Sequence, residues 1–191
     1  MPTVASDMNC PGCGASVSLD QKTCEYCGRK LTFTSVKDVR SLSAQESMKF
    51  LRRYKDALDK APDNPDVQTS LGLMLFDRGQ FVQARQAFDR AVANGTDNAD
   101  VLFYAALARF RAKKPFQFKI NEAKEILEVL DSSIMMNPLP QYFYAKAHVI
   151  ETLIEKKHIS YPETSAVVRQ EAQDAHLTEA DIIDTNQILG I

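Results

Sequence analysis

Several residue types and patterns are scarce or absent in this chain of 191 residues. It has no tryptophan, three histidines and seven glycines, and its four cysteines all lie between positions 10 and 27. No apolar run approaches the roughly 18 residues that a membrane-spanning helix requires. The first nine residues lack the basic start and apolar stretch of a signal peptide. We therefore expect a cytoplasmic protein in a reducing setting, where paired cysteines bind metals more often than they form disulfides.

The motifs of common catalytic sites are also missing. The sequence contains no glycine-rich phosphate loop, no His-Glu-x-x-His and no Gly-x-Ser-x-Gly. Its histidines, His148, His158 and His176, share no metal-ligand spacing with the cysteines, and we expect His148 to be a packing residue. Because no set of titratable residues converges in the sequence, we predict a protein that is not an enzyme and has no catalytic residues.

Charge is nearly balanced over the whole chain, with a formal net charge of −2, but it is unevenly spread. The segment 109–119 has no acidic residue and five basic ones: Arg109, Arg111, Lys113, Lys114 and Lys119. Phe110, Phe116 and Phe118 lie between them, a pattern that suits contact with phosphates and bases or the docking of an acidic protein. The simpler alternative is a loop whose phenylalanines pack inward while its basic groups stay hydrated.

Two Cys-x-x-Cys-Gly motifs, at 10–14 and 24–28, use all four cysteines and are separated by ten residues. Each motif places two thiolates on one turn, and its final glycine permits a positive φ there. Alternating apolar residues predict one hairpin arm around Val17 and Leu19, and a further strand around Leu31 and Phe33. The four thiolates are the expected ligands of a single metal ion: Cys10, Cys13, Cys24 and Cys27.

These motifs and the hairpin between them resemble the zinc-ribbon family over residues 8–34. The resemblance implies one structural Zn²⁺ ion held by the four cysteines. Four thiolates leave no position for a reactive water, so such an ion stabilises the fold and does not hydrolyse substrates. A segment of about 40 residues rarely folds without a metal or disulfides. An iron site of the rubredoxin type is the main alternative, although the ten-residue spacer is short for that family.

The apolar pattern changes to a helical period after the ribbon. Ser43 and Glu46 form a capping-box signature, and the helix that follows is expected to end before Pro62. Further helices are predicted over 66–78, 80–94, 121–133, 141–156 and 164–175, with a last short helix from Thr178. We therefore expect a mainly α protein, a solenoid of helical hairpins with a small β domain at its N-terminus.

The predicted hairpin over 66–94 resembles a tetratricopeptide repeat. The matching positions are Leu71, Gly72, Phe81, Ala84, Phe88 and Ala91, whereas Gln68 replaces the family's hallmark tryptophan. Weaker copies follow after 34 and 40 further residues, and the helix before 62 resembles the second half of an incomplete repeat. The resemblance implies a zinc ribbon at 1–36 and a helical repeat domain with a C-terminal capping helix at 41–191. We expect the two to be separable, so that Cys24→Ser unfolds the ribbon and leaves the helices intact.

The same resemblance implies a concave face that is lined by the first helix of each hairpin and binds a protein or peptide. The candidate residues for this face are Thr69, Leu73, Phe76, Asp77, Phe103, Leu107 and Phe110. The alternative is that these residues form ordinary core. The function we expect is that of a non-enzymatic zinc-binding adaptor. The alternative is a nucleic-acid-binding or regulatory protein that uses the ribbon and the basic segment 109–119.

Overall fold

The protein is described here by a computed structural model that covers residues 7–96 and 98–191. It has two compact units, one ending at Asp97 and one beginning at Asn98. Within the described residues, the first unit contains the ribbon and four α-helices, and the second contains five further α-helices. The boundary that the sequence predicts at 37–40 falls within the first unit and stays a prediction. No helix in the described part of the chain combines the length and apolarity needed to cross a membrane.

The ribbon contains a small two-stranded sheet. Strand β1 (Asp7–Asn9) pairs antiparallel with β2 (Ser16–Ser18), so that Met8 lies opposite Val17. The strand predicted around Leu31 and Phe33 is wrong. The Leu31 amide donates to the carbonyl of Lys22 at 2.7 Å, but the Phe33 amide donates to Ser70 Oγ at 2.9 Å. The chain therefore leaves the ribbon at this point to pack on the helices, and no strand forms.

A short helix follows, in the interval between the two domains that the sequence predicts. Helix α1 (Val36–Arg40) begins at Ser35, whose side chain accepts a hydrogen bond from the Asp38 amide. Val36 and Val39 are buried, and the helix packs against α3 (Pro65–Asp77). Because Val36 and Val39 are three positions apart, they lie on the same face of α1, and this face packs on α3.

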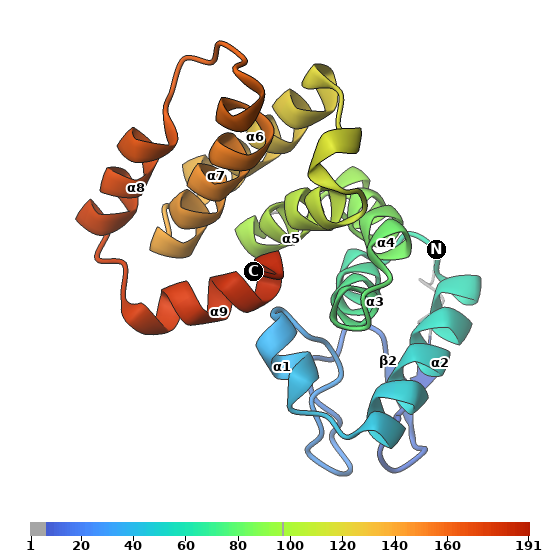
Figure 1. The fold of residues 1–191 in the computed structure, drawn as a ribbon. Coiled ribbons are helices and arrows are strands. Elements are labelled where there is room, and N and C mark those ends of the chain that lie inside the picture. Colours follow the sequence, from blue (N-terminus) through green and yellow to red (C-terminus); the bar gives the residue numbers. More distant parts are fainter. Residues whose placement is uncertain (1–6, 97) are drawn as a thin grey trace. The chain divides into compact units, whose positions relative to one another are not determined.

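The three following helices form the body of the first unit. Helix α2 (Ala44–Lys60) begins with the predicted capping box, in which Ser43 and Glu46 bond each other's backbone amides. Helices α3 and α4 (Phe81–Ala93) are separated by a turn at Gly79, where φ is 72°. Helix α3 is buried from Val67 to Phe76 because it packs against α1, α2 and α4 (Figure 1).

The close crossing of α3 and α4 depends on Gly72. A Cβ atom at this position would lie 2.6 Å from the ring of Phe88, which is fully buried. Ala84 and Ala91 on α4 are also fully buried. Small residues thus let the two backbones approach while one phenylalanine fills the space between them, as the repeat pattern predicts.

The second unit consists of two helical hairpins and a final helix (Figure 1). Helix α5 packs against α6, α6 against α7 and α7 against α8, while α9 contacts α7 and α5. Two short 3₁₀ turns, η1 and η2, lie in the loops. The bounds are α5 Ala99–Arg111, η1 Pro115–Gln117, α6 Ile120–Met136, α7 Pro140–Leu153, η2 Glu155–Lys157, α8 Ser165–Asp174 and α9 Glu179–Leu189. The helices predicted in this half of the chain are confirmed.

Lys146 on α7 is a buried charge in the second unit, with a side chain that is 5% exposed. Its ammonium lies 2.6 Å from a carboxylate oxygen of Asp131 and also pairs with Glu163. Burial alone would lower the pKa of Lys146, but the two carboxylates outweigh it, and the net effect is a raised pKa. The pair of acids therefore keeps this lysine charged within the helical packing.

Candidate metal centre and interaction surface

The structure brings the four cysteine thiols together. All four Sγ atoms lie within 4.8 Å of one another. Cys10 Sγ is 3.7 Å from Cys27 Sγ, and Cys13 Sγ is 3.8 Å from Cys24 Sγ. A tetrahedral zinc centre with Zn–S bonds of about 2.3 Å has S···S edges of about 3.8 Å. The four sulfurs thus already have the spacing of a tetrathiolate site.

The two knuckles have the same backbone geometry. In the first, the Gly14 amide donates to the Cys10 carbonyl at 2.9 Å, and in the second the Gly28 amide donates to the Cys24 carbonyl at 2.9 Å. Both glycines have positive φ, 80° and 69°. The motif that repeats in the sequence therefore repeats in the structure, and each copy delivers two sulfurs to one point.

The local hydrogen bonds favour the thiolate that a metal requires at Cys10. Burial opposes ionisation of this thiol, but the amides of Cys13 and Gly12 stabilise the thiolate, and the pKa falls to about 7. The pKa of Cys27 rises to about 11, although the Arg29 amide favours its thiolate, because desolvation and the three neighbouring cysteines oppose a further negative charge. A cation shared by the four sulfurs would remove this mutual repulsion.

Arg29 connects the second knuckle to the helices. Its guanidinium pairs with Glu46, the residue that closes the capping box of α2. The ion pair and the Ser43 hydrogen bonds lower the pKa of Glu46 to about 2. The arginine side chain also lies over Gly12 of the first knuckle, where a Cβ atom would meet Nε at 2.6 Å. The sequence analysis did not single out this arginine, because its partner is 17 residues away.

The end of the ribbon shares a buried core with α2. Tyr54 donates a hydrogen bond of 2.6 Å from its hydroxyl to the carbonyl of Leu31. The ring of Phe33 packs edge-on against that of Phe50, with 5.1 Å between centroids. All four of these residues are buried. The cysteine-rich segment and the first helices are thus joined by apolar packing and not only by the chain.

The residues expected on a concave binding face lie mostly in the core. Thr69, Leu73 and Phe76 are buried in the first unit. Phe103, Leu107 and Phe110 are buried in the second unit, where Phe103 stacks on Tyr142 at 4.5 Å and Phe110 packs against Phe118 and His148. Asp77 is exposed and forms an ion pair of 3.0 Å with Arg40 of α1.

In this conformation a partner could not contact the six buried side chains of the expected binding face. On α3 the reason is local, because α1 and the end of the ribbon occupy a side of the helix that a binding face would need. Partner contact at Asp77 stays a prediction.

The basic segment 109–119 does not present its five cations together. Arg111 donates to the carbonyl of Ile188 at 2.6 Å, and its partial burial lowers the pKa of its guanidinium. Lys113 pairs with Glu122 at 2.5 Å. Lys114 and Lys119 are exposed and Arg109 is half-buried.

Two of the three phenylalanines in this segment also face inward. Phe110 and Phe118 are buried and stack on each other, whereas Phe116 is 76% exposed. The segment therefore resembles the simpler of the two alternatives more closely, with two of its three aromatic rings packed and its basic groups paired or hydrated.

Comparison with known families adds one result. Residues 51–99 match the tetratricopeptide repeat family. The matched region includes most of α2, all of α3 and α4 and the first residue of α5, so it is centred on the hairpin with the Gly72–Phe88 crossing. No curated protein shows a significant match to the chain. Tetratricopeptide repeats are scaffolds for protein interaction, and the cysteine cluster is consistent with a zinc ribbon placed before this tetratricopeptide hairpin.

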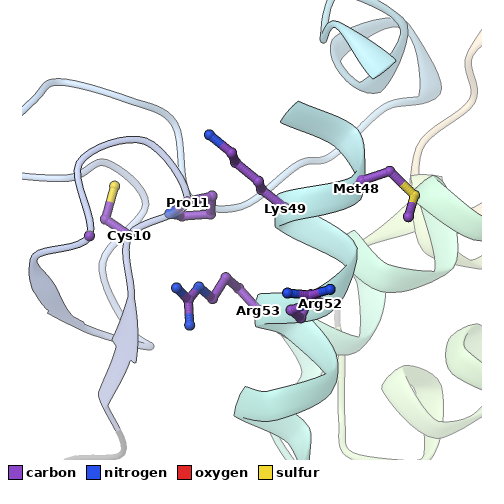
Figure 2. A pocket seen from close by; sticks show the side chains of 7 residues that line it. Cys10, Pro11, Met48, Lys49, Arg52 and Arg53 are labelled. Carbon is purple, nitrogen blue, oxygen red and sulfur yellow. The ribbon is translucent and has the colours of Figure 1, made fainter. Parts of the chain in front are cut away.

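A hollow of 390 Å³ lies between the first knuckle and α2 of the tetratricopeptide match, and the sequence analysis did not anticipate it. Cys10, Pro11 and Gly14 form one wall, and α2 contributes Met48 and three basic residues (Figure 2). The signal was present in the sequence: four of the seven residues from 49 to 55 are basic. Their alternation with the core residues Phe50, Leu51 and Tyr54 made them look like an ordinary solvated helix face.

Proposed function

We propose that this protein is a non-enzymatic adaptor of the cytoplasm that binds one structural zinc ion and, through its helical hairpins, another protein or peptide. The observation that carries the proposal is the combination of a four-thiolate cluster and a tetratricopeptide hairpin in one compact unit. The first supplies a folding site and the second a type of scaffold that holds partners.

Zinc is the metal we propose because the donor set consists of four thiolates. Tetrahedral sulfur sites take zinc or iron, and four thiolates with no open position describe a structural zinc site. Cys10, Cys13, Cys24 and Cys27 would hold the ion, whose contribution is to fix the two knuckles against each other. A structural zinc site contributes on the order of 10–16 kcal/mol to the folding of a small domain.

The absence of an enzymatic role is likewise a proposal. His148, the histidine on a helix, hydrogen-bonds Thr152 at 3.3 Å and packs against Phe110, and its burial lowers its pKa. These contacts support a packing role. Buried tyrosines such as Tyr54 and Tyr142 likewise have their hydroxyls engaged with Leu31 and Asp100.

Two measurements test the proposed function. Metal analysis of the purified full chain should give one zinc per chain and no iron, and the content should fall when Cys10 and Cys13 are both changed to serine. Affinity capture from native cell extract followed by mass spectrometry should recover a protein partner that survives nuclease treatment. Iron in the purified chain would overturn the metal assignment. A partner lost on nuclease treatment would replace the adaptor with the nucleic-acid alternative.

A further inference from the structure

Three hollows that share lining residues follow α2, and we refer to them together as the α2 groove. The first, of 390 Å³, lies against the first knuckle. The second, of 350 Å³, is bordered by Arg78 and Gln80 at the turn between α3 and α4. The third, of 200 Å³, lies between α2 and α4 with α3 beneath it. Met48 and Arg52 line both the first and the second hollow, and Lys55 lines both the second and the third.

The shared residues form a stripe on α2. Met48, Arg52 and Lys55 are four and three positions apart, which places them on the same helix face. Leu58 extends the stripe by three more positions into the third hollow. At 1.5 Å per residue the stripe from Met48 to Leu58 is about 15 Å long. A partner segment of roughly three helical turns would span the groove.

The lining of the groove is strongly basic. Among the described residues that line it, six are basic and Asp56 alone is acidic; the basic ones are Lys49, Arg52, Arg53, Lys55, Arg78 and Arg90. The whole chain has 23 basic and 25 acidic residues, so this excess is local. Asp56 lies 3.9 Å from Arg53. Among the residues that the structure describes, Lys49, Arg52 and Lys55 form no ion pair. At these three positions the groove therefore carries positive charge that no described residue neutralises by an ion pair.

The negative charge of a metal centre would explain the basic residues at the knuckle end of the groove, but not those further along it. A divalent ion with four thiolates carries a net charge of −2, and Figure 2 shows Lys49 and Arg53 extending from α2 towards Cys10 and Pro11. Cysteine lines neither the second nor the third hollow within the described residues, yet these hollows contain Lys55, Arg78 and Arg90. These basic side chains are therefore open to pair with another negative group.

The apolar residues of the groove indicate which class of molecule would carry the negative groups. Leu58, Leu71, Leu75 and Ala87 form the apolar lining of the third hollow, and Met48 is 55% exposed between the first two. Aromatic residues are absent from the lining of all three hollows in the described part of the chain. Surfaces that bind single-stranded nucleic acid combine positive charge with aromatic stacking. Basic walls around aliphatic side chains suit a peptide that has both acidic and apolar residues.

We propose that the α2 groove binds an acidic segment of a partner protein. Its aspartate and glutamate side chains pair with Arg52, Lys55 and Arg90, and one or two of its apolar side chains enter the third hollow. This inference rests on the proposed interaction function and specifies the surface and the partner chemistry for it. It also moves the binding surface from the buried side of α3 to the exposed side of α2, where the first knuckle of the ribbon borders one end of the groove.

A peptide-binding experiment with the full zinc-loaded chain tests this assignment. The probes are fluorescent synthetic peptides of about 14 residues, with glutamates on one helix face and leucines three or four positions apart in varied registers. Versions with glutamine in place of glutamate should bind at least about tenfold more weakly. The double change Arg52→Glu with Lys55→Glu should weaken binding of the acidic peptides by at least about tenfold.

The matched control is Lys22→Glu with Lys124→Glu, which makes the same change in net charge at two exposed positions outside the groove. It should alter binding by less than about twofold. Arg90→Glu alone, on α4, should weaken binding while α2 keeps its wild-type sequence. Circular dichroism and zinc content establish that each variant is folded.

Several outcomes would overturn the groove. One is that no acidic peptide binds. Another is that the groove and control variants lose equal affinity for the peptide. The third is that single-stranded DNA displaces the peptide at lower concentration than unlabelled peptide does. Failure of the proposed function looks different. If the charge-reversed chain still captures the native partner, the groove is wrong while the adaptor role stands. If acidic peptides bind at the groove but no protein is captured, the groove stands and the adaptor role fails.

Discussion

The hydroxyl of Tyr54 in α2 donates a hydrogen bond of 2.6 Å to the carbonyl of Leu31 in the ribbon, and both residues are buried. Burial raises the pKa of Tyr54 well above its ordinary value, so the hydroxyl keeps its proton throughout the physiological range. This bond joins a metal-binding segment to a helical repeat at a place where neither side reaches water. The stability of each part therefore depends on the other.

Removal of the Tyr54 hydroxyl should destabilise the first unit. Tyr54→Phe leaves the carbonyl of Leu31 buried without its donor, which costs about 1–3 kcal/mol. Urea unfolding followed by circular dichroism measures the loss, and zinc release should shift to lower urea with it. Tyr26→Phe is the matched control because Tyr26 is 71% exposed. Equal stability of both variants would show that the buried bond contributes nothing net.

Zinc removal should affect the helices as well as the ribbon. Phe33 packs against Phe50 and bonds to Ser70, so loss of the ribbon fold exposes part of the surface of α2 and α3. A strong chelator, or Cys24→Ser, should therefore reduce the helical circular dichroism signal and lower the unfolding temperature. Tyr26→Ser, in the same knuckle, should change neither. An unchanged helical signal after zinc loss would favour the separable ribbon that the sequence alone predicts.

Metal binding should weaken as the pH falls through about 7. The pKa of Cys10 is lowered to about 7, so its thiolate is present above that pH and becomes protonated below it. Because a metal binds the thiolate, protons then compete with it and the apparent affinity decreases. Cys27, with its pKa raised to about 11, should release a proton on binding at pH 8. Zinc titration calorimetry in two buffers of different ionisation enthalpy measures both effects, and an affinity independent of pH from 8 to 6 would contradict them.

The crossing of α3 and α4 should not tolerate an added methyl group. In Gly72→Ala the new Cβ would lie 2.6 Å from the Phe88 ring, and overpacking of this kind costs about 1–3 kcal/mol. The double variant Gly72→Ala with Phe88→Leu should recover part of the loss, because a smaller side chain vacates the space. Thermal unfolding of the two variants provides the comparison. Additive losses in the double variant would show that the two residues do not compete for one volume.

The charge of Lys146 should depend on its two acidic partners. The double variant Asp131→Asn with Glu163→Gln leaves the buried ammonium without a carboxylate. It should lower the free energy of unfolding by about 3 kcal/mol. This is the lower end of the range for a buried unpaired charge, because both acids are partly exposed. Lys146→Met removes the charge with its partners left in water and should be closer to neutral. Chemical denaturation of the second unit measures both variants. A larger loss for Lys146→Met would mean that the ion pairs themselves stabilise the fold.

Local signals in the sequence were enough to predict that the four cysteines converge and where most helices form. Two Cys-x-x-Cys-Gly motifs with positive-φ glycines specify four converging sulfurs, whatever surrounds them. The capping boxes at Ser43 and Thr178, and the small residues at Gly72 and Ala84, act within one helix or one hairpin. Such short-range features are visible to pattern analysis because cause and consequence lie a few residues apart.

Only the tertiary structure decided what the ribbon does to the helices. The bond from Tyr54 to Leu31 and the ion pair from Arg29 to Glu46 join residues about twenty positions apart, and no local period signals them. The same long-range packing turned the expected binding residues of α3 into core and left the basic stripe of α2 open. The sequence by itself determined which elements form, because propensity and capping are local. Which faces those elements bury depends on packing between distant segments, and this packing determines which surfaces remain exposed.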